Sequence, residues 1–174
     1  SLELSLGVRQ EFSNFFDSPL LFALGSEFSW TKNYAISGSI SRNFRQPTLN
    51  DLFWLDDSPE LSPETAWQFE VNHNFKFKPL KLKLQLSTFY NDITDMIRWL
   101  PNQNAIWTPQ NVDAVKTYGL NAMISKEFSL NSFKLSTKLQ HELVFAEDAQ
   151  TSNQLIYTPK NQSIVSLNAT YKQY

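Results

Sequence analysis

Apolar and polar residues alternate along almost the whole chain with a period of two, which is typical of β-strands with one apolar face. The clearest run places Leu80, Leu82, Leu84 and Leu86 between Lys81, Lys83, Gln85 and Ser87. The alternation predicts eight strands, at residues 2–12, 20–30, 34–44, 65–77, from 80 onward, about 114–128, 133–145 and about 162–174. Helical periodicity is nearly absent, so the predicted fold class is all-β.

The lengths of the predicted strands and of their connections favour a membrane protein. The strands run about 11 to 14 residues, whereas strands of globular proteins centre near 5 to 6, and about 9 to 11 tilted residues cross a bilayer. Short connections at 31–33, 78–79 and 129–132 alternate with long ones at 13–19, 45–64, 94–113 and 146–160. Short turns at one end and long loops at the other are typical of outer-membrane barrels.

The aromatic residues gather at the two ends of the predicted strands. The group at the short-turn end is Phe28, Trp30, Tyr34, Phe75, Phe77, Phe128, Phe133, Tyr171 and Tyr174, and the group at the long-loop end is Phe12, Phe44, Trp67, Tyr90 and Phe145. Two such girdles mark the two interfaces of a bilayer. We therefore predict an antiparallel, up-and-down transmembrane β-barrel, or part of one, in contact with outer-membrane lipid.

Composition excludes several classes of function. The 174 residues carry a net charge of −2 and include no cysteine, so nothing indicates nucleic-acid binding, and disulfide or thiolate chemistry is excluded. No signal peptide is visible, because the sequence begins directly in strand pattern. We expect the chain to be a mature piece of a longer protein, forming a single partial barrel domain over 1–174.

The third predicted strand leads into an apolar stretch and then an acidic one. Residues 44–54 read FRQPTLNDLFW, and residues 59–64 read PELSPE. This resembles the R-x-P-x-x-x-x-L … N-P-x-L-x-P-E signature of TonB-dependent outer-membrane receptors, with Ser58 in place of the signature's Asn. Residues 89–97 and 118–121 are similar to a strand end and a strand start of the same family. Residues 99–101 and 107–112 look like its cobalamin-transporter branch in Bacteroidetes-type bacteria.

The resemblance implies a Gram-negative outer-membrane barrel of about 22 strands, plugged by an N-terminal domain. This chain then supplies eight strands, and the plug with its TonB-contacting segment is missing from it. The implied function is binding and import of a small-molecule chelate, a cobalamin or an iron–siderophore complex, with energy supplied through the TonB complex. No cofactor and no covalent chemistry are implied.

Four aromatic residues in the predicted external loops are candidates for substrate binding: Phe53, Trp54, Trp99 and Trp107. Large aromatic side chains bury ligand surface at little conformational cost. The alternative is that they only pack neighbouring loops together.

Other polar residues suggest no catalytic or metal site. His73 and His141 fall in the lipid-facing register, where they cannot converge with other groups. The acidic loop residues Asp51, Asp56, Asp57, Glu60 and Glu64 are interpreted as a solvated loop rather than a calcium site. The inward residues Arg9, Glu27, Glu70, Lys83, Lys138 and Glu142 are expected to form a polar lumen wall with cross-strand charge pairs.

Three other interpretations stay open at this point. Eight strands can close into a self-contained outer-membrane protein. The same alternation also fits a soluble all-β module, such as a carbohydrate-binding, lectin-like sandwich. An outer-membrane hydrolase is the least favoured, because no inward Ser–His or Asp–His arrangement is visible.

Overall fold

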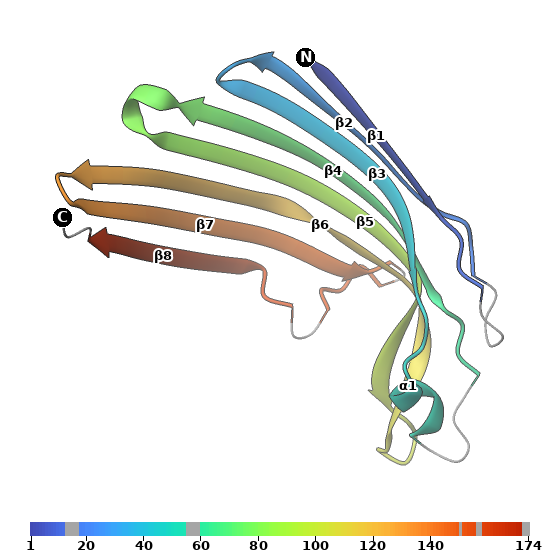
Figure 1. Cartoon of the computed structure of the whole chain (residues 1–174). Coiled ribbons are helices and arrows are strands. Elements are labelled where there is room, and N and C mark those ends of the chain that lie inside the picture. Colours follow the sequence, from blue (N-terminus) through green and yellow to red (C-terminus); the bar gives the residue numbers. More distant parts are fainter. Residues whose placement is uncertain (13–17, 55–59, 150, 156–157, 172–174) are drawn as a thin grey trace.

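The computed structural model describes residues 1–12, 18–54, 60–149, 151–155 and 158–171, which form one twisted antiparallel sheet (Figure 1). Its strands are β1 (Leu2–Arg9), β2 (Leu21–Thr31), β3 (Tyr34–Arg45), β4 (Glu64–Phe77), β5 (Leu82–Pro101), β6 (Trp107–Leu130), β7 (Phe133–Asp148) and β8 (Asn161–Tyr171). A short helix, α1 (Leu49–Phe53), lies between β3 and β4, and a 3-10 helix (Lys78–Leu80) precedes β5. Among these residues, no helix has the length and apolar character needed to span a membrane.

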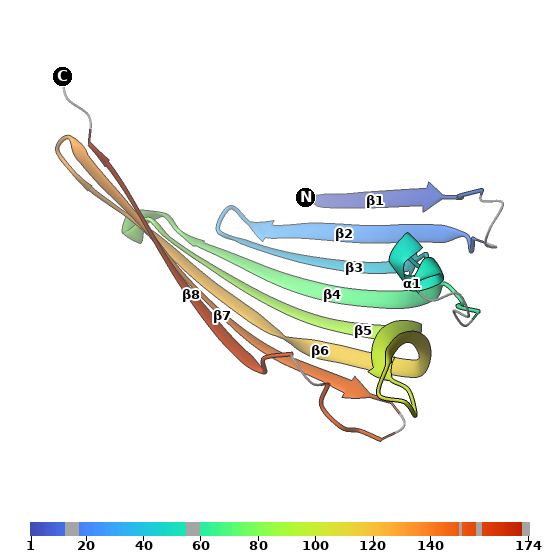
Figure 2. The ribbon, with the colours of Figure 1, turned by 90° about the horizontal axis from the view of Figure 1, so that it is seen from below.

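In the described chain, each strand pairs antiparallel with its neighbours in sequence, in the order β1 to β8. The connections after β2, β4 and β6 therefore lie at one end of the sheet, and those after β1, β3, β5 and β7 lie at the other. This confirms the predicted separation of short turns from long loops. Viewed from below, the sheet bends into an open arc (Figure 2).

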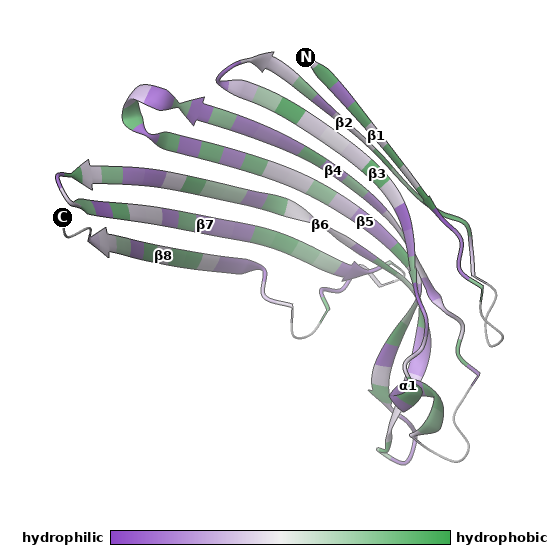
Figure 3. Ribbon diagram, in the orientation of Figure 1, coloured by the Kyte–Doolittle hydropathy of each residue, from purple (hydrophilic) through white to green (hydrophobic). Residues whose placement is uncertain are grey.

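The strand pairing divides the sheet into an apolar and a polar face, because directly opposed residues share a face. One apolar row crosses six strands through Tyr34, Phe75, Leu84, Ile124, Leu139 and Val165. Figure 3 shows the resulting alternation along the strands. No second sheet covers the apolar face within the described residues, and Leu6 on it is 73% exposed. The soluble sandwich interpretation is therefore wrong.

Aromatic contacts on the apolar face support the two predicted girdles. Tyr34 and Phe75 stack near the short-turn end, with ring centroids 4.8 Å apart. Tyr118 and Phe145 stack near the long-loop end at 5.3 Å. Of the predicted members, Phe12 follows the end of β1, and Tyr174 lies outside the described residues.

The structure corrects the predicted long loop at 94–113. β5 continues to Pro101 and β6 begins at Trp107, so these two strands form a hairpin that extends beyond the sheet. Past Thr94 and Ala114, β5 and β6 pair only with each other. Figure 1 shows this extension leaving the sheet beside α1. We refer to residues 96–112 as the hairpin extension.

Smaller corrections concern strand ends. Leu80 belongs to the 3-10 helix rather than to a strand, and Lys81 turns the chain into β5 with a positive φ of 47°. The last predicted strand begins at Asn161, and its predicted residues 172–174 lie outside the described part.

The first and last strands are open edges. Within the described residues, β1 pairs only with β2 and β8 only with β7, and both are exposed along their whole length. Eight strands close only when the sheet curves tightly enough to bring its edges together. The shallow arc of Figure 2 keeps the edges apart. The structure therefore does not show the self-contained eight-stranded barrel.

Candidate functional site

The buried residues of the chain gather at the long-loop end. Val115 is fully buried there, and Pro109, Ile97, Leu61 and Asp51 are 7% exposed or less. Among the described residues, one cluster of buried side chains forms where the loop between β3 and β4 folds against the hairpin extension, while Leu21 and Ala146 are buried on β2 and β7. This cluster contains two of the four predicted binding residues, Trp54 and Trp99.

α1 begins with a reciprocal cap. The backbone N–H and the hydroxyl of Thr48 donate to Asp51 Oδ2 at 2.9 and 2.7 Å, and the Asp51 N–H donates to Thr48 Oγ1 at 3.2 Å. Such a capping box satisfies N–H groups that a helix start leaves without partners. It therefore allows a helix of only five residues to form within the loop.

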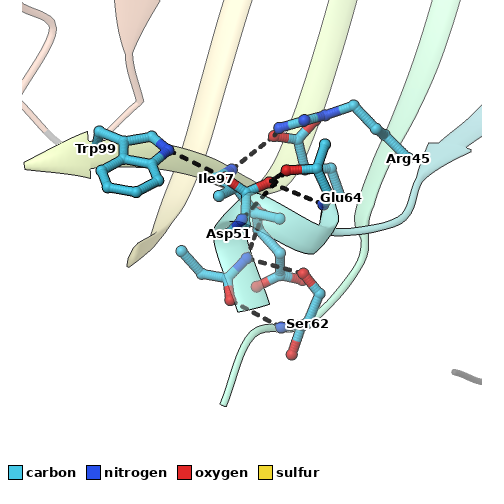
Figure 4. Close-up of polar contacts among 9 residues, drawn as sticks. Arg45, Asp51, Ser62, Glu64, Ile97 and Trp99 are labelled. Atoms are coloured by element: carbon cyan, nitrogen blue, oxygen red, sulfur yellow. Dashed lines mark hydrogen bonds and ion pairs between the residues drawn. The ribbon is translucent and has the colours of Figure 1, made fainter. Parts of the chain in front are cut away.

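Asp51 also links α1 to the hairpin extension. The indole N–H of Trp99 donates to Asp51 Oδ1 at 3.0 Å (Figure 4). Burial acts to raise the pKa of Asp51, but the hydrogen bonds from Thr48 and Trp99 and the charge of Arg45 together hold that pKa below its usual value. The carboxylate is therefore charged, and both of its oxygens accept hydrogen bonds from within the protein. Its burial corrects the expectation of a wholly solvated acidic loop.

A second link joins the two ends of the loop. Arg45, the last residue of β3, donates to both oxygens of Glu64, the first residue of β4, from Nε at 2.8 Å and from Nη2 at 2.5 Å. Glu64 Oε1 also accepts the backbone N–H of Ile97 at 2.6 Å. The first and last charged residues of the family-like signature thus form one bidentate pair, which is a geometrically specific contact.

The returning arm of the loop is fixed by Asn111 of the hairpin extension. Its side chain accepts the N–H of Ser62 at 2.8 Å and donates to the Ser62 carbonyl at 3.0 Å. It also donates to the carbonyl of Asp95 at 2.5 Å. Asp95 has a φ of 55°, at the point where the hairpin extension leaves the sheet. The Asn111 side chain therefore holds both the bend at Asp95 and the loop segment at Ser62.

The predicted aromatic residues divide into supporting and exposed ones. Trp54 and Trp99 meet edge to face, with ring centroids 5.5 Å apart, and Trp99 is half-buried. Trp54 is 57%, Phe53 73% and Trp107 55% exposed. In the paired strands, Pro109 lies opposite Trp99, and Trp107 is two residues before Pro109 on β6. Opposed residues and residues two apart on a strand share a face, so Trp107 and Trp99 lie on the same face of the hairpin extension. Both sit on strands, not in the loop that was predicted.

We call Phe53, Trp54 and Trp107 the aromatic rim. Among the other acidic residues, Glu60 is exposed, whereas Asp56 and Asp57 lie outside the described residues. The described part of the chain contains no group of three or more His, Cys, Asp or Glu side chains able to hold a metal ion.

The polar wall differs from the prediction of cross-strand charge pairs. Glu27 lies opposite Glu3, and Lys83 lies opposite Lys76, so like charges face each other. Arg9 pairs with the nearby Glu11 instead. The other predicted wall residues, Glu70, Lys138 and Glu142, form no ion pair with any described residue. Local strand pairing, rather than charge matching, therefore sets which wall residues face each other.

The two histidines lie in the apolar register, as predicted. His73 is opposite Ile36 and Leu86, and its Nδ1 lies 2.9 Å from the Tyr34 hydroxyl. His141 Nδ1 lies 2.9 Å from the Ser163 hydroxyl. Each histidine therefore has a local hydrogen-bond partner on its own face.

Sequence reasoning missed the structural role of Asp51. The signal was present, because Thr48 and Asp51 match the S/T-x-x-D/E pattern that starts helices. The contact with Trp99 was not visible, since it joins residues 48 positions apart. The ion pair of Arg45 and Glu64 was likewise hidden, although both residues belong to the signature.

A curved sheet with an apolar outer face, aromatic girdles, a polar inner face and large loops at one end is part of the wall of a transmembrane β-barrel. A family model for the β-barrel of TonB-dependent receptor-like proteins matches residues 1–174, and the chain belongs to this family. Its members are transporters and receptors of the Gram-negative outer membrane, not enzymes.

Two curated relatives are named vitamin B12 transporter BtuB. The protein from Vibrio vulnificus is 32% identical over 108 residues, which cover 56% of this chain and 17% of that protein. The protein from Photobacterium profundum is 24% identical over 161 residues, covering 90% and 26%. The chain thus spans about a sixth to a quarter of the length of these relatives.

Solved structures share the fold. The copper transporter OprC superposes with a TM-score of 0.70 at 14% identity, over 88% of this chain and 24% of that one. The siderophore receptor PirA from Pseudomonas aeruginosa gives 0.69 at 20% identity, over 98% and 37%. At these identities the likeness supports the barrel fold alone.

Proposed function

We propose that this chain forms one arc of the barrel of an outer-membrane receptor that binds a scarce chelate, most simply a cobalamin, and imports it with TonB-derived energy. The plug and the TonB-contacting segment belong to parts of the receptor beyond this chain. The observation that carries the proposal is the aromatic rim, which is exposed at the long-loop end on a hydrogen-bonded support.

The chemistry of the rim favours a large, weakly charged ligand. Asp51 accepts a hydrogen bond from Trp99, and Arg45 is paired with Glu64, so these three charged groups are bound within the protein rather than directed to a ligand. Flat ring systems stack on exposed aromatic side chains without requiring charge. A cobalamin presents such a surface, and both curated relatives carry the name vitamin B12 transporter.

An iron–siderophore complex is the second candidate, because the siderophore receptor PirA shares this fold. A catecholate complex is strongly anionic and requires cationic side chains. In the described part of the loop between β3 and β4, no lysine or arginine follows Arg45, the last residue of β3, and Arg45 is already paired with Glu64. We also propose a Bacteroidetes-type source, on the sequence resemblance of residues 99–101 and 107–112.

The test uses the complete receptor in lipid nanodiscs, with binding of cyanocobalamin and of a ferric catecholate measured by titration calorimetry. Trp54→Ala and Trp107→Ala should each weaken cobalamin binding about 5- to 150-fold, since an aromatic stacking contact contributes about 1–3 kcal/mol. Trp30→Ala is the matched control, because Trp30 is 72% exposed at the end of β2, away from the long loops.

Two results would overturn the proposal. Unchanged affinity in both rim variants would leave loop packing as the role of the aromatic residues. Binding of the catecholate but not of cyanocobalamin would assign the receptor to the siderophore class.

A further inference from the structure

A lysine lies on the lipid-facing side of the sheet near the short-turn end. Lys126 of β6 is opposite Leu82 of β5 and Thr137 of β7, so it belongs to the apolar face. Its ammonium nitrogen lies 4.8 Å from the centre of the Phe128 ring on the same strand. Phe77 of β4 lies opposite Leu82 in the same row. Lys126 is therefore among the aromatic residues that mark the membrane interface on this side.

The charge of Lys126 is not balanced by the protein. Both residues opposite it are uncharged, and it forms no ion pair with any described residue. Glu127 is the next residue on the strand, and its side chain belongs to the other face. By contrast, Lys116 lies on the same strand and face near the long-loop end, directly between Asp92 and Glu147. A lipid-facing ammonium group is costly without water or an anion beside it, so Lys126 favours an anion from outside the described chain.

The neighbouring turns add positive charge. Residues 76–83 and 126–134, which surround the turns after β4 and β6, include six lysines, one glutamate and no other charged residue. Figure 1 shows these turns at the same end of the sheet. Lys81 immediately precedes the residue opposite Lys126, is exposed, and donates from its ammonium group to Ser129 Oγ at 3.0 Å. An ammonium group has three donors, so Lys81 can still bind an anion.

An apolar surface leads from these two lysines toward the middle of the membrane. Ile124, two residues before Lys126 on the same face of β6, is 44% exposed, and Leu139 opposite it is 48% exposed. A small soluble anion would contact the lysines alone. A lipid contacts both features, because its headgroup meets the ammonium groups and its acyl chains lie along the apolar residues.

We propose that Lys126 and Lys81 bind the headgroup of a net-anionic phospholipid, such as phosphatidylglycerol. The short turns of outer-membrane barrels are periplasmic, so this lipid belongs to the inner leaflet of the outer membrane. The surrounding lysines repel the positive group of a zwitterionic headgroup, which favours a lipid with net negative charge. The inference depends on the membrane barrel, which membership of the family establishes, and not on the ligand that the receptor imports.

The experiment places the complete receptor in phosphatidylcholine nanodiscs that contain a small fraction of phosphatidylglycerol with a photoactivatable diazirine near its headgroup. After illumination, mass spectrometry of the digest should find the label on peptides from residues 76–83 and 126–134. A lysine near an anionic headgroup contributes about 5-fold in affinity, so Lys126→Gln and Lys81→Gln should each lower this labelling about 5-fold, and the double variant about 30-fold. A phosphatidylcholine probe with the same diazirine should label these peptides several-fold less.

Lys116→Gln is the matched control, because it removes a lysine from the same face of β6 whose charge Asp92 and Glu147 already balance. It should leave the labelling unchanged, and Lys126→Arg should retain it. Heat-modifiable migration in electrophoresis checks that each variant is folded, and the comparison of the two probes on the unaltered receptor needs no variant. Unchanged labelling in the double variant, equal labelling by the two probes, or an equal loss in Lys116→Gln would each overturn the inference.

Discussion

Replacing Trp99 by phenylalanine removes one hydrogen-bond donor and keeps most of the aromatic surface. The lost bond joins the indole N–H to the carboxylate of Asp51 at 3.0 Å. Asp51 is 5% exposed, so water cannot readily replace the donor. A hydrogen bond to a charged group contributes about 1.5–3 kcal/mol. The equilibrium constant between α1 docked on the hairpin extension and α1 released from it should therefore fall roughly 10- to 150-fold.

Hydrogen exchange on the complete receptor in nanodiscs measures this local opening directly. The reporter amides are those of Asp51 and Leu52, which donate to the Thr48 hydroxyl and carbonyl. Their protection should fall by the factor above in Trp99→Phe and stay constant in Trp107→Phe, which changes an exposed indole of the same hairpin. Unchanged protection in Trp99→Phe would show that the bond does not hold α1 in place.

Acidification should release α1 from the hairpin extension, because folding lowers the pKa of Asp51. The charged Asp51 carboxylate stabilises the docked α1 fully above the ordinary aspartate pKa of about 4, and this stabilisation is lost as the pH falls through the lower pKa of the folded protein. Exchange at 48–54 should show this loss, and Asp51→Asn should remove its pH dependence. Leu120→Arg on the apolar face should cost about 2–4 kcal/mol in the unfolding free energy, and Gln85→Arg on the polar face much less. Gly119→Ala places a Cβ in steric overlap with the Leu143 carbonyl oxygen and 3.0 Å from the Phe89 ring, so it should destabilise the barrel by about 1–3 kcal/mol; Gly7→Ala, with no atom within 4 Å, should not. Urea unfolding in lipid vesicles reports these last two comparisons, and equal costs for the paired variants would contradict them.

The strands and their two faces could be predicted from the sequence, because a strand with one buried or lipid-facing side requires alternation at every second residue. The hairpin extension could not. Pro101 and Pro109 read as loop residues, since proline cannot donate to a sheet ladder. Beyond Thr94 each strand of the hairpin has one partner only, and proline is tolerated on such an open edge.

The exposure of the aromatic residues was predicted from the sequence, and their role in binding stays a prediction. The exposed aromatic residues were visible as an unusual composition for a loop, and Phe53, Trp54 and Trp107 are exposed as a binding role requires. The support beneath them was not visible. The bond between Asp51 and Trp99 depends on how far the hairpin extension reaches, and that distance is set by pairing between residues far apart in sequence.

The strict sequential order of the strands has a consequence for how such proteins change over evolution. Each strand of the described sheet takes its register from the strands adjacent to it in the chain. Gain or loss of a whole hairpin would therefore leave every other pairing intact and alter the circumference by a fixed step of two strands. Long loops can likewise diversify at one end without disturbing the turns at the other. Barrels of different bore and different cargo can thus arise by duplicating a unit of two strands.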